Sequence, residues 1–177
     1  MVQKIVLVGY MGSGKSTIGR LLAKKRQLPF VDLDFYIEEK ENLTIEEIFL
    51  QKGEIYFRKI ESHYFHELIN SKNSIVLSLG GGTPCYANNH LQLNHKKCQS
   101  FYLQTTVATL TRRLKGAQQQ RPLIANLSHD DLFDFVAKQS FERSYFYMFC
   151  KHIIKTEELT IDEIIAKIEL KIISMES

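Results

Sequence analysis

The sequence has few of the residues that mark secreted or fibrous proteins. It contains 3 prolines and 3 cysteines in 177 residues, and it has no Pro/Ser-rich linker and no internal repeat. The cysteines Cys85, Cys98 and Cys150 are odd in number and far apart, which excludes a small disulfide-stabilised fold and favours a reducing compartment. We therefore expect a cytoplasmic protein.

Long hydrophobic runs are also missing. No apolar stretch approaches the length needed to cross a membrane, and the first strand-like segment begins too close to Met1 to leave room for a signal peptide. With 44% hydrophobic and 24% charged residues, the composition is that of a globular protein. A chain of this length favours one domain over residues 1–177, and we expect no membrane contact.

Acidic residues are absent from one third of the chain. No Asp or Glu occurs between Leu68 and His129, a stretch that includes Arg113, Lys115 and Arg121. This segment is either an ordinary solvated face or a surface that meets anionic ligands. The formal net charge of +3 is too small to indicate nucleic acid, which we do not expect as a partner.

The strongest motif that is present is the segment Gly9–Thr17, which matches the phosphate-loop pattern G-x-x-x-x-G-K-[ST]. Its glycines allow consecutive backbone N–H groups to turn toward phosphate oxygens. Lys15 reaches the β- and γ-phosphates, and the Ser16 hydroxyl is a ligand for Mg²⁺. The residues expected to bind ATP in this loop are Gly12, Ser13, Gly14, Lys15, Ser16 and Thr17.

The flanks of the loop support this interpretation. The apolar run 5–8 is typical of a buried parallel strand, and residues 16–25 have helical apolar spacing. The loop thus lies between a strand and a helix, where the helix N-terminus also favours negative charge.

Two carboxylates, Asp32 and Asp34, end the next strand-like stretch, residues 28–34. Ligands of open α/β sheets lie beyond the carboxyl ends of parallel strands, so both should meet the phosphate loop. The third apolar run, 74–79, has no acid at its end, which makes Asp32 the candidate metal ligand beside Ser16. Asp34 is a candidate base for a substrate hydroxyl. The alternative is that both are turn residues or helix caps.

Three further segments carry candidate acceptor-binding residues. Residues 34–70 are helical with a break at Gly53, and they include Arg58 and Glu61, which either clamp a carboxylate or form a surface salt bridge. The triplet Gly80–Gly82 follows the third strand and either admits a substrate or makes a tight turn. Arg143 lies on the inward stripe of a helix that begins at Ser128, where a cation needs an anion.

The remaining segments complete an alternating pattern. A fourth strand is expected at 99–103, a helix at 106–114, a last strand at 150–154, and a terminal helix capped by Thr160 that we interpret as structural only. The polar stretch 115–123 predicts a mobile lid that carries Arg121 toward the transferred phosphoryl group.

Together these motifs resemble the shikimate kinase family over nearly the whole chain. The resemblance implies an α/β class protein with a three-layer α/β/α phosphate-loop kinase fold and a five-stranded parallel sheet. It also implies a helical substrate-binding insertion at about 33–61 and a mobile lid at about 112–124. The segment 144–151 departs from the family pattern by being more aromatic.

The resemblance further implies the chemistry, which is Mg²⁺-dependent transfer of the γ-phosphoryl group of ATP to the 3-hydroxyl of shikimate by a monomer. The implied catalytic residues are Asp34, Lys15 and Arg121, and Arg121 also binds ATP. The implied acceptor ligands are Asp34, Arg58, Gly80, Gly81, Gly82 and Arg143, and the implied metal ligands are Ser16 and Asp32. Either Arg113 or Lys115 stacks on adenine. A gluconate-type kinase and a nucleotide-binding regulatory module are the alternatives.

Overall fold

A five-stranded parallel sheet forms the centre of the molecule. The computed structural model describes residues 4–116 and 124–176. The strand order is β2-β3-β1-β4-β5, and every neighbouring pair is parallel. The strands are β1 (Lys4–Val8), β2 (Phe30–Asp32), β3 (Ile75–Ser78), β4 (Cys98–Gln104) and β5 (His152–Lys155). The expected α/β class and five-stranded sheet are confirmed.

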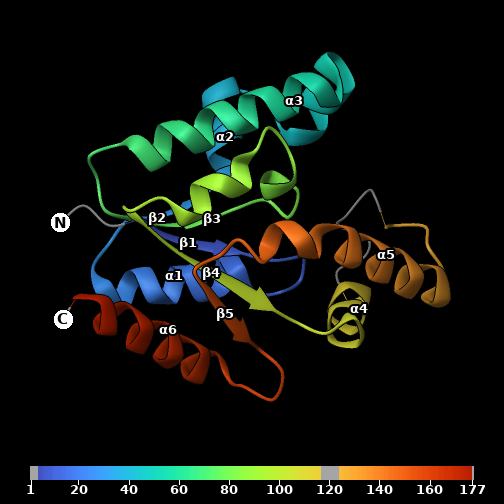
Figure 1. Cartoon of the computed structure of the whole chain (residues 1–177). Coiled ribbons are helices and arrows are strands. Elements are labelled where there is room, and N and C mark those ends of the chain that lie inside the picture. The colour runs from blue at the N-terminus through green and yellow to red at the C-terminus, as the bar shows by residue number, and fades with distance from the viewer. Residues whose placement is uncertain (1–3, 117–123, 177) are drawn as a thin grey trace.

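Helices cover both faces of this sheet (Figure 1). They are α1 (Lys15–Arg26), α2 (Leu33–Glu41), α3 (Ile45–Asn70), α4 (Val107–Lys115), α5 (His129–Tyr147) and α6 (Ile161–Glu176), with two 3₁₀ turns, η1 (Thr83–Cys85) and η2 (Asn89–Asn94). Helices α1 and α6 pack on one face, while α2, α3 and α5 contribute to the core on the other. The three-layer arrangement is therefore confirmed.

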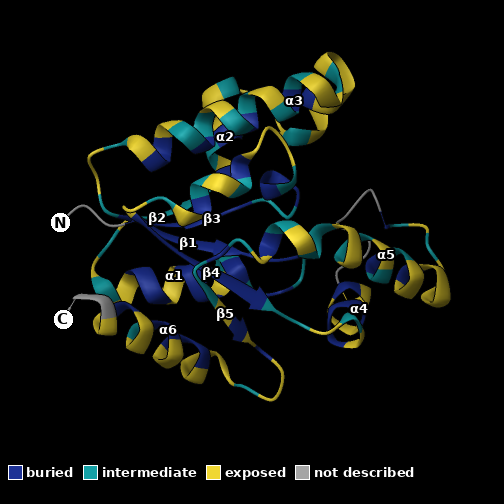
Figure 2. Cartoon of the chain, viewed as in Figure 1, coloured by how far each residue is buried: buried dark blue, intermediate teal, exposed yellow. Residues whose placement is uncertain are grey.

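The central strands β1 and β3 are mainly apolar because the middle of the sheet is buried on both faces. Every residue of β1 and β3 is buried, and Ile5, Val6 and Leu7 have no exposed surface. Figure 2 shows this as a dark blue sheet between helices whose outer faces are exposed. Such double burial is what makes parallel strands read as unbroken hydrophobic segments rather than alternating ones.

The helical insertion bends where the sequence indicates a break. Helix α3 begins with a capping box in which Thr44 and Glu47 satisfy each other's backbone N–H groups. Gly53 interrupts it with φ 80° and ψ 171°, and a Cβ at this position would contact nothing within 4 Å. Backbone conformation, not space, therefore requires glycine here. The bend directs the second half of α3, with Arg58 and Glu61, toward the sheet edge.

Two expected boundaries are wrong. The second strand ends at Asp32 rather than Asp34, because the Asp32 side chain caps α2 by accepting a hydrogen bond from the Asp34 N–H at 3.2 Å. Asp34 thus lies in the first turn of a helix. The last strand is residues 152–155 rather than 150–154, because Cys150 N–H bonds back to the Tyr147 carbonyl in the turn that ends α5.

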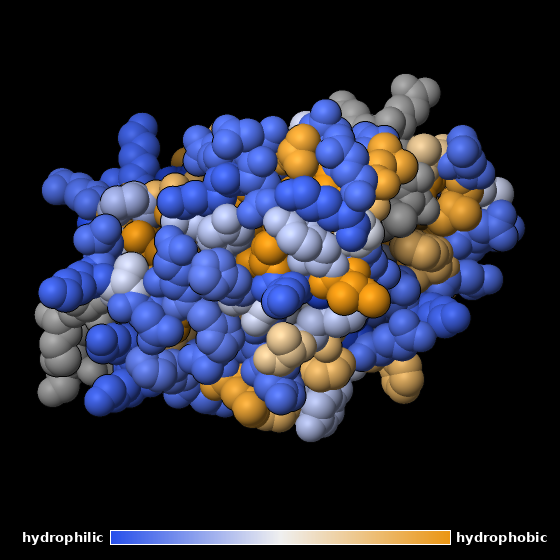
Figure 3. Space-filling model, turned by 90° about the horizontal axis from the view of Figure 1, so that it is seen from above, coloured by the Kyte–Doolittle hydropathy of each residue, from blue (hydrophilic) through white to orange (hydrophobic). Residues whose placement is uncertain are grey.

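The surface is mixed in polarity. Seen over the side that carries α2 and α3, it is mostly hydrophilic, with hydrophobic residues in small separate groups (Figure 3). Among the residues that the structure describes, no helix combines the length and the apolar character required to span a bilayer.

Candidate active site

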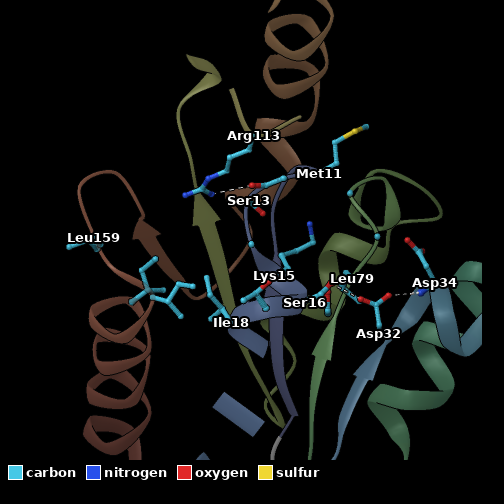
Figure 4. Close-up of a pocket in the computed structure, with 18 residues that line it drawn as sticks. Met11, Ser13, Lys15, Ser16, Ile18, Asp32, Asp34, Leu79, Arg113 and Leu159 are labelled. Carbon is cyan, nitrogen blue, oxygen red and sulfur yellow. Dashed lines mark hydrogen bonds between the residues drawn. The ribbon is translucent and has the colours of Figure 1, made fainter. Parts of the chain in front are cut away.

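A cavity of about 600 Å³ opens at the carboxyl edge of the sheet (Figure 4). The phosphate loop forms its floor, Asp32 and Asp34 stand on one side of Lys15, and Leu159 lies on the other. The lining residues from 11 to 18 include all six loop residues expected to bind ATP. These side chains therefore converge at the carboxyl ends of the parallel strands, the edge that the sequence predicted.

The phosphate loop leads directly into α1. Gly14 is the N-terminal cap of α1 and adopts the left-handed conformation, with φ 94° and ψ 10°. The Lys15 ammonium is buried and donates to the carbonyl oxygens of Gly9 at 2.7 Å and Tyr10 at 3.0 Å. These contacts hold the cation over the loop, within the cavity that the α1 N-terminus faces.

Ser16 and Asp32, the two predicted metal ligands, lie together beside the lysine. The Ser16 hydroxyl donates to Asp32 Oδ2 at 2.8 Å, although the two residues are 16 positions apart. The other carboxylate oxygen of Asp32 caps α2. Asp32 is therefore both a helix cap and a neighbour of Ser16. One carboxylate oxygen, Oδ1, caps α2, and the other, Oδ2, accepts the Ser16 hydroxyl.

Asp34 lines the same cavity at the carboxyl edge of the sheet, and its carboxyl group has a raised pKa. Burial raises the pKa of Asp34 to about 6, and the neighbouring carboxylates of Asp32 and Glu61 act in the same direction, against Lys15 and Arg58. Perturbed carboxyl groups of this kind are typical of catalytic bases.

Arg58 is fixed by a buried ion pair. Its Nη1 lies 2.9 Å from Glu61 Oε2, and only 1% of the Glu61 side chain is exposed. The other Glu61 oxygen accepts the Thr83 hydroxyl at 2.7 Å. The interpretation of Arg58 and Glu61 as a surface salt bridge is therefore wrong. Because Glu61 is fully engaged, it holds the guanidinium at one position.

Each glycine of the triplet packs against a different polar side chain. A Cβ on Gly80 would lie 2.8 Å from Asp34 Oδ1, and one on Gly81 would lie 3.2 Å from Arg143 Nη1. A Cβ on Gly82 would lie 2.9 Å from Arg58 Nη1. The segment also makes a tight turn, since Thr83 N–H bonds to the Gly80 carbonyl at 3.1 Å. The triplet therefore makes a tight turn, and this is compatible with the second interpretation, that it admits a substrate.

Arg143 approaches this triplet from α5. Its guanidinium lies 5.4 Å from the ring centroid of Tyr10 in the phosphate loop, and Nη2 donates to Gln139 Oε1 at 2.5 Å. One turn further along α5, the Tyr147 hydroxyl donates to the Gly81 carbonyl at 2.6 Å. The phosphate loop, the triplet and α5 thus meet at one point, although Arg58, Gly82 and Arg143 adjoin the cavity rather than line it.

The opposite wall contains residues that sequence reasoning missed. Leu159, Ile161 and Ile164 line the cavity, so the first turn of α6, which we interpreted as structural only, also forms part of the cavity wall. Their position in the sequence could have indicated this. The segment that follows the carboxyl end of the last strand must lie at the ligand-binding edge of the sheet. Arg113 also lines the cavity and donates to the Gly12 carbonyl at 3.1 Å, whereas Lys115 does not line it.

One predicted residue cannot be placed in this geometry. Arg121 and most of the expected lid, residues 117–123, lie outside the described residues. Of the predicted lid at about 112–124, the structure describes the end of α4 with its cap Gly116, which precede residues 117–123, and Ile124, which follows them. The role of Arg121 therefore stays a prediction.

A phosphate loop between a buried strand and a helix, with a hydroxyl–carboxylate pair at the end of β2, is typical of phosphate-loop nucleotide-binding proteins, the class that includes the phosphate-loop kinases. The comparisons with known proteins identify the branch. The family model described as shikimate kinase matches residues 11–173. The chain belongs to the shikimate kinase family.

Individual relatives cover nearly the whole chain. A shikimate kinase from Flavobacterium psychrophilum is 52% identical over 167 residues, which are 94% of this chain and 97% of the relative. The crystal structure of a shikimate kinase from Bacteroides thetaiotaomicron aligns with a TM-score of 0.89 at 36% identity over 96% of this chain and 98% of that one. A shikimate kinase from Acinetobacter baumannii in complex with shikimate aligns with a TM-score of 0.86 at 31% identity, over 98% and 94%.

Proposed function

We propose that this chain transfers the γ-phosphoryl group of ATP to the 3-hydroxyl of shikimate, giving 3-phosphoshikimate and ADP. The observation that carries the proposal is the convergence on Gly80–Gly82 of one carboxylate, Asp34, and two arginines, Arg58 and Arg143, beside the phosphate loop. Shikimate offers one carboxylate and three hydroxyl groups, so it matches two cations and a hydrogen-bond acceptor. Family membership supports the same acceptor.

Arg58 and Arg143 would bind the shikimate carboxylate, and Asp34 would bind its hydroxyl groups. Guanidinium groups form bidentate, charge-assisted hydrogen bonds with carboxylates, and the buried Glu61 keeps Arg58 oriented for this contact. The triplet would let the acceptor approach the backbone, because any side chain at these positions would collide with Asp34, Arg58 or Arg143.

The residues fit a magnesium ion at the Ser16–Asp32 pair. A hydroxyl and a carboxylate 2.8 Å apart are hard oxygen donors, and Mg²⁺ in nucleotide sites takes one or two such protein ligands together with phosphates and waters. Bound there, the ion would neutralise charge on the β- and γ-phosphates during transfer.

The protein's part in the reaction would be alignment and charge neutralisation. Asp34 orients the acceptor hydroxyl and accepts its proton as the new oxygen–phosphorus bond forms, while the bond from the γ-phosphorus to the β,γ-bridging oxygen breaks and ADP leaves. Lys15 neutralises the developing charge on the phosphates, and Arg121 is proposed to do so from the lid.

The raised pKa of Asp34 gives an expected pH dependence. Because the base must be ionised, the rate at ATP and shikimate concentrations well below their KM values should fall tenfold per pH unit below a midpoint near pH 6, since the pH dependence then reports the free enzyme. An unperturbed aspartate would put this midpoint close to pH 4. A flat profile between pH 7 and pH 5 would exclude Asp34 as the titrating group.

For the adenine side, Arg113 is the better of the two basic candidates, since it lines the cavity and Lys115 does not. Arg113→Ala should raise KM for ATP about fivefold, the size expected for loss of one cation–π contact, and leave KM for shikimate unchanged. Lys115→Ala is the matched control, with an expected change below about 1.5-fold. Equal effects of the two variants would contradict this assignment.

The direct test of the proposed function is ADP release from the purified protein with ATP and Mg²⁺. Shikimate alone should stimulate release, while gluconate and nucleoside monophosphates should leave it at the background rate. Stimulation by gluconate would favour the gluconate-type alternative. Nucleotide binding without stimulation by any acceptor would favour a regulatory module.

The monomeric state, the absence of a nucleic-acid partner and the cytoplasmic location are predictions from the sequence. Over α2 and α3 hydrophobic residues occur in small separate groups, which argues against a dimer formed through that face (Figure 3). Sedimentation of the purified protein at micromolar concentration tests the monomeric state, with a mass near 20.6 kDa expected.

A further inference from the structure

Tyr86 lies against the acceptor-binding arginine. Its ring centroid is 4.2 Å from the Cζ atom of Arg58, a closer contact than the 5.1 Å between that atom and the ring of Phe57. The Tyr86 hydroxyl is 3.3 Å from Glu54 Oε1, and Arg58 Nε is 3.4 Å from the same oxygen. Tyr86, Glu54 and Arg58 thus form a closed triangle of contacts.

The backbone that presents Tyr86 is fixed in an unusual conformation. Ala87 and Asn88, which follow it, have φ values of 48° and 57°. Alanine in this left-handed region costs roughly 1 kcal/mol or more, and such residues persist only where the surrounding structure holds them. Here the holding contact is the bond from Asn89 N–H to the Tyr86 carbonyl at 2.9 Å.

Asn89 in turn anchors this turn to the rest of the site. It is fully buried, donates to the Thr83 carbonyl at 2.9 Å and accepts the Ser62 hydroxyl of α3 at 2.8 Å. The segment after the glycine triplet is therefore tied to the helix that carries Arg58. The ring of Tyr86 has a defined position relative to the guanidinium.

The remaining contacts of Arg58 show what this ring does. Glu54 contacts Nε and Glu61 contacts Nη1, so among the described residues no hydrogen bond occupies Nη2. The guanidinium also lies against Gly82, where a Cβ would be 3.3 Å from Cζ. The carboxylates fix the in-plane position of the guanidinium, and the Tyr86 ring limits rotation out of that plane. A planar donor group must be held in this way to meet a carboxylate edge-on.

We propose that Tyr86 is a positioning residue for the acceptor, which holds the plane of the Arg58 guanidinium so that its free edge meets the acceptor carboxylate. This inference rests on the proposed function, because it requires Arg58 to bind that carboxylate. Tyr86 acts through Arg58, because it is not among the described residues that line the cavity.

The test is a set of steady-state measurements on Tyr86→Ala, Tyr86→Phe, Arg58→Ala and the double variant Tyr86→Ala/Arg58→Ala. Tyr86→Ala should raise KM for shikimate about fivefold, the upper end of the range for a cation–π contact at an exposed site, since Tyr86 is 39% exposed. We expect kcat to change less than about threefold and KM for ATP to stay constant. Tyr86→Phe keeps the ring and should stay within about twofold of wild type.

Tyr36→Ala is the matched control. Tyr36 also lies near a cation, with Lys40 Nζ 5.2 Å from its ring centroid, and also donates to a glutamate, Glu67, at 2.7 Å. It lies between α2 and α3, where it contacts Tyr64 and Glu67 rather than Arg58, so its removal should leave KM for shikimate within about twofold. Thermal unfolding of each variant identifies any loss of folded protein.

The KM values of the two single variants distinguish failure of the proposed Arg58 contact from failure of the inference about Tyr86. If Arg58→Ala leaves KM for shikimate unchanged, the proposed acceptor contact is wrong and this inference falls with it. If Arg58→Ala raises KM but Tyr86→Ala does not, only the inference is wrong. In the Arg58→Ala background, Tyr86→Ala should add less than about twofold, and a full additional increase would mean that Tyr86 acts by another route. The methyl ester of shikimate, which has no carboxylate charge, should be insensitive to Tyr86→Ala.

Discussion

Replacing Asp34 by asparagine is expected to lower kcat at least about a hundredfold. Loss of a positioned general base typically costs 10²- to 10⁴-fold, and asparagine keeps the shape of the side chain without accepting a proton. KM for shikimate should change less than kcat, because the amide oxygen can still accept a hydrogen bond. Single-turnover phosphoryl transfer at saturating shikimate and ATP measures this step directly.

The same substitution should stabilise the free protein. The folded carboxyl group has a pKa of about 6, above the ordinary 3.8, so the folded state binds the proton more tightly than the unfolded chain. The cost of ionisation therefore appears as pH rises from about 4 to about 6 and is fully present at pH 7. The full difference between the folded and the ordinary pKa corresponds to about 3 kcal/mol of unfolding free energy. Because Asp34 is only half-buried and faces the cavity, we expect a gain of about 1–2 kcal/mol.

Asp134→Asn, at an exposed position of α5, is the control for charge removal. It should change neither kcat nor the pH dependence of unfolding by urea. If Asp34→Asn kept kcat within about twofold of wild type, its role as a base would be refuted. If it destabilised the protein at pH 7, the raised pKa would be the statement in error.

Arg58→Ala is expected to lower kcat/KM for shikimate by about a hundredfold or more and to destabilise the fold. Truncating one partner of a buried, hydrogen-bonded charge pair costs about 2–5 kcal/mol in binding. The protein itself should lose about 3 kcal/mol, since Glu61, 1% exposed, would keep its charge with only the Thr83 hydroxyl as a hydrogen-bond donor among the described residues. KM for ATP should stay near the wild-type value.

A second variant separates the two effects. Arg58→Ala/Glu61→Gln removes the buried uncompensated charge, so it should recover most of the stability and none of the shikimate affinity. Arg26→Ala is the control for loss of an ion pair elsewhere, because Arg26 lies 3.6 Å from Glu169 between α1 and α6. Full recovery of shikimate affinity in the double variant would mean that Arg58 serves the fold rather than the acceptor.

Much of the nucleotide side of the site was predictable from contiguous residues. The glycines, Lys15 and Ser16 of the phosphate loop act within nine consecutive positions, and strand and helix patterns on either side fix their surroundings. The break at Gly53 and the caps at Thr44 and Ser128 were predictable for the same reason, since each depends on a few neighbouring residues.

The acceptor side was predictable only as a set of alternatives. Arg58 with Glu61 has the spacing of an ordinary surface pair, and only the packing of α3 under Thr83 buries Glu61. The end of the second strand was misplaced because the cap formed by Asp32 depends on a side-chain orientation that hydrophobic periodicity does not contain. The wall formed by Leu159, Ile161 and Ile164 was missed because the segment that follows Thr160 has the pattern of a common amphipathic helix.

The sequence by itself determined that this chain holds phosphate on a loop between a strand and a helix, because local backbone geometry and helix polarity follow from adjacent residues. Only the tertiary structure decided which distant side chains meet: Asp34 with Gly80, Arg143 with Gly81 and Arg58 with Tyr86. It also decided that Asp34 has a raised pKa. The physical reason is that burial and electrostatic energy at a point depend on every segment packed around it, and these segments join only in the folded chain.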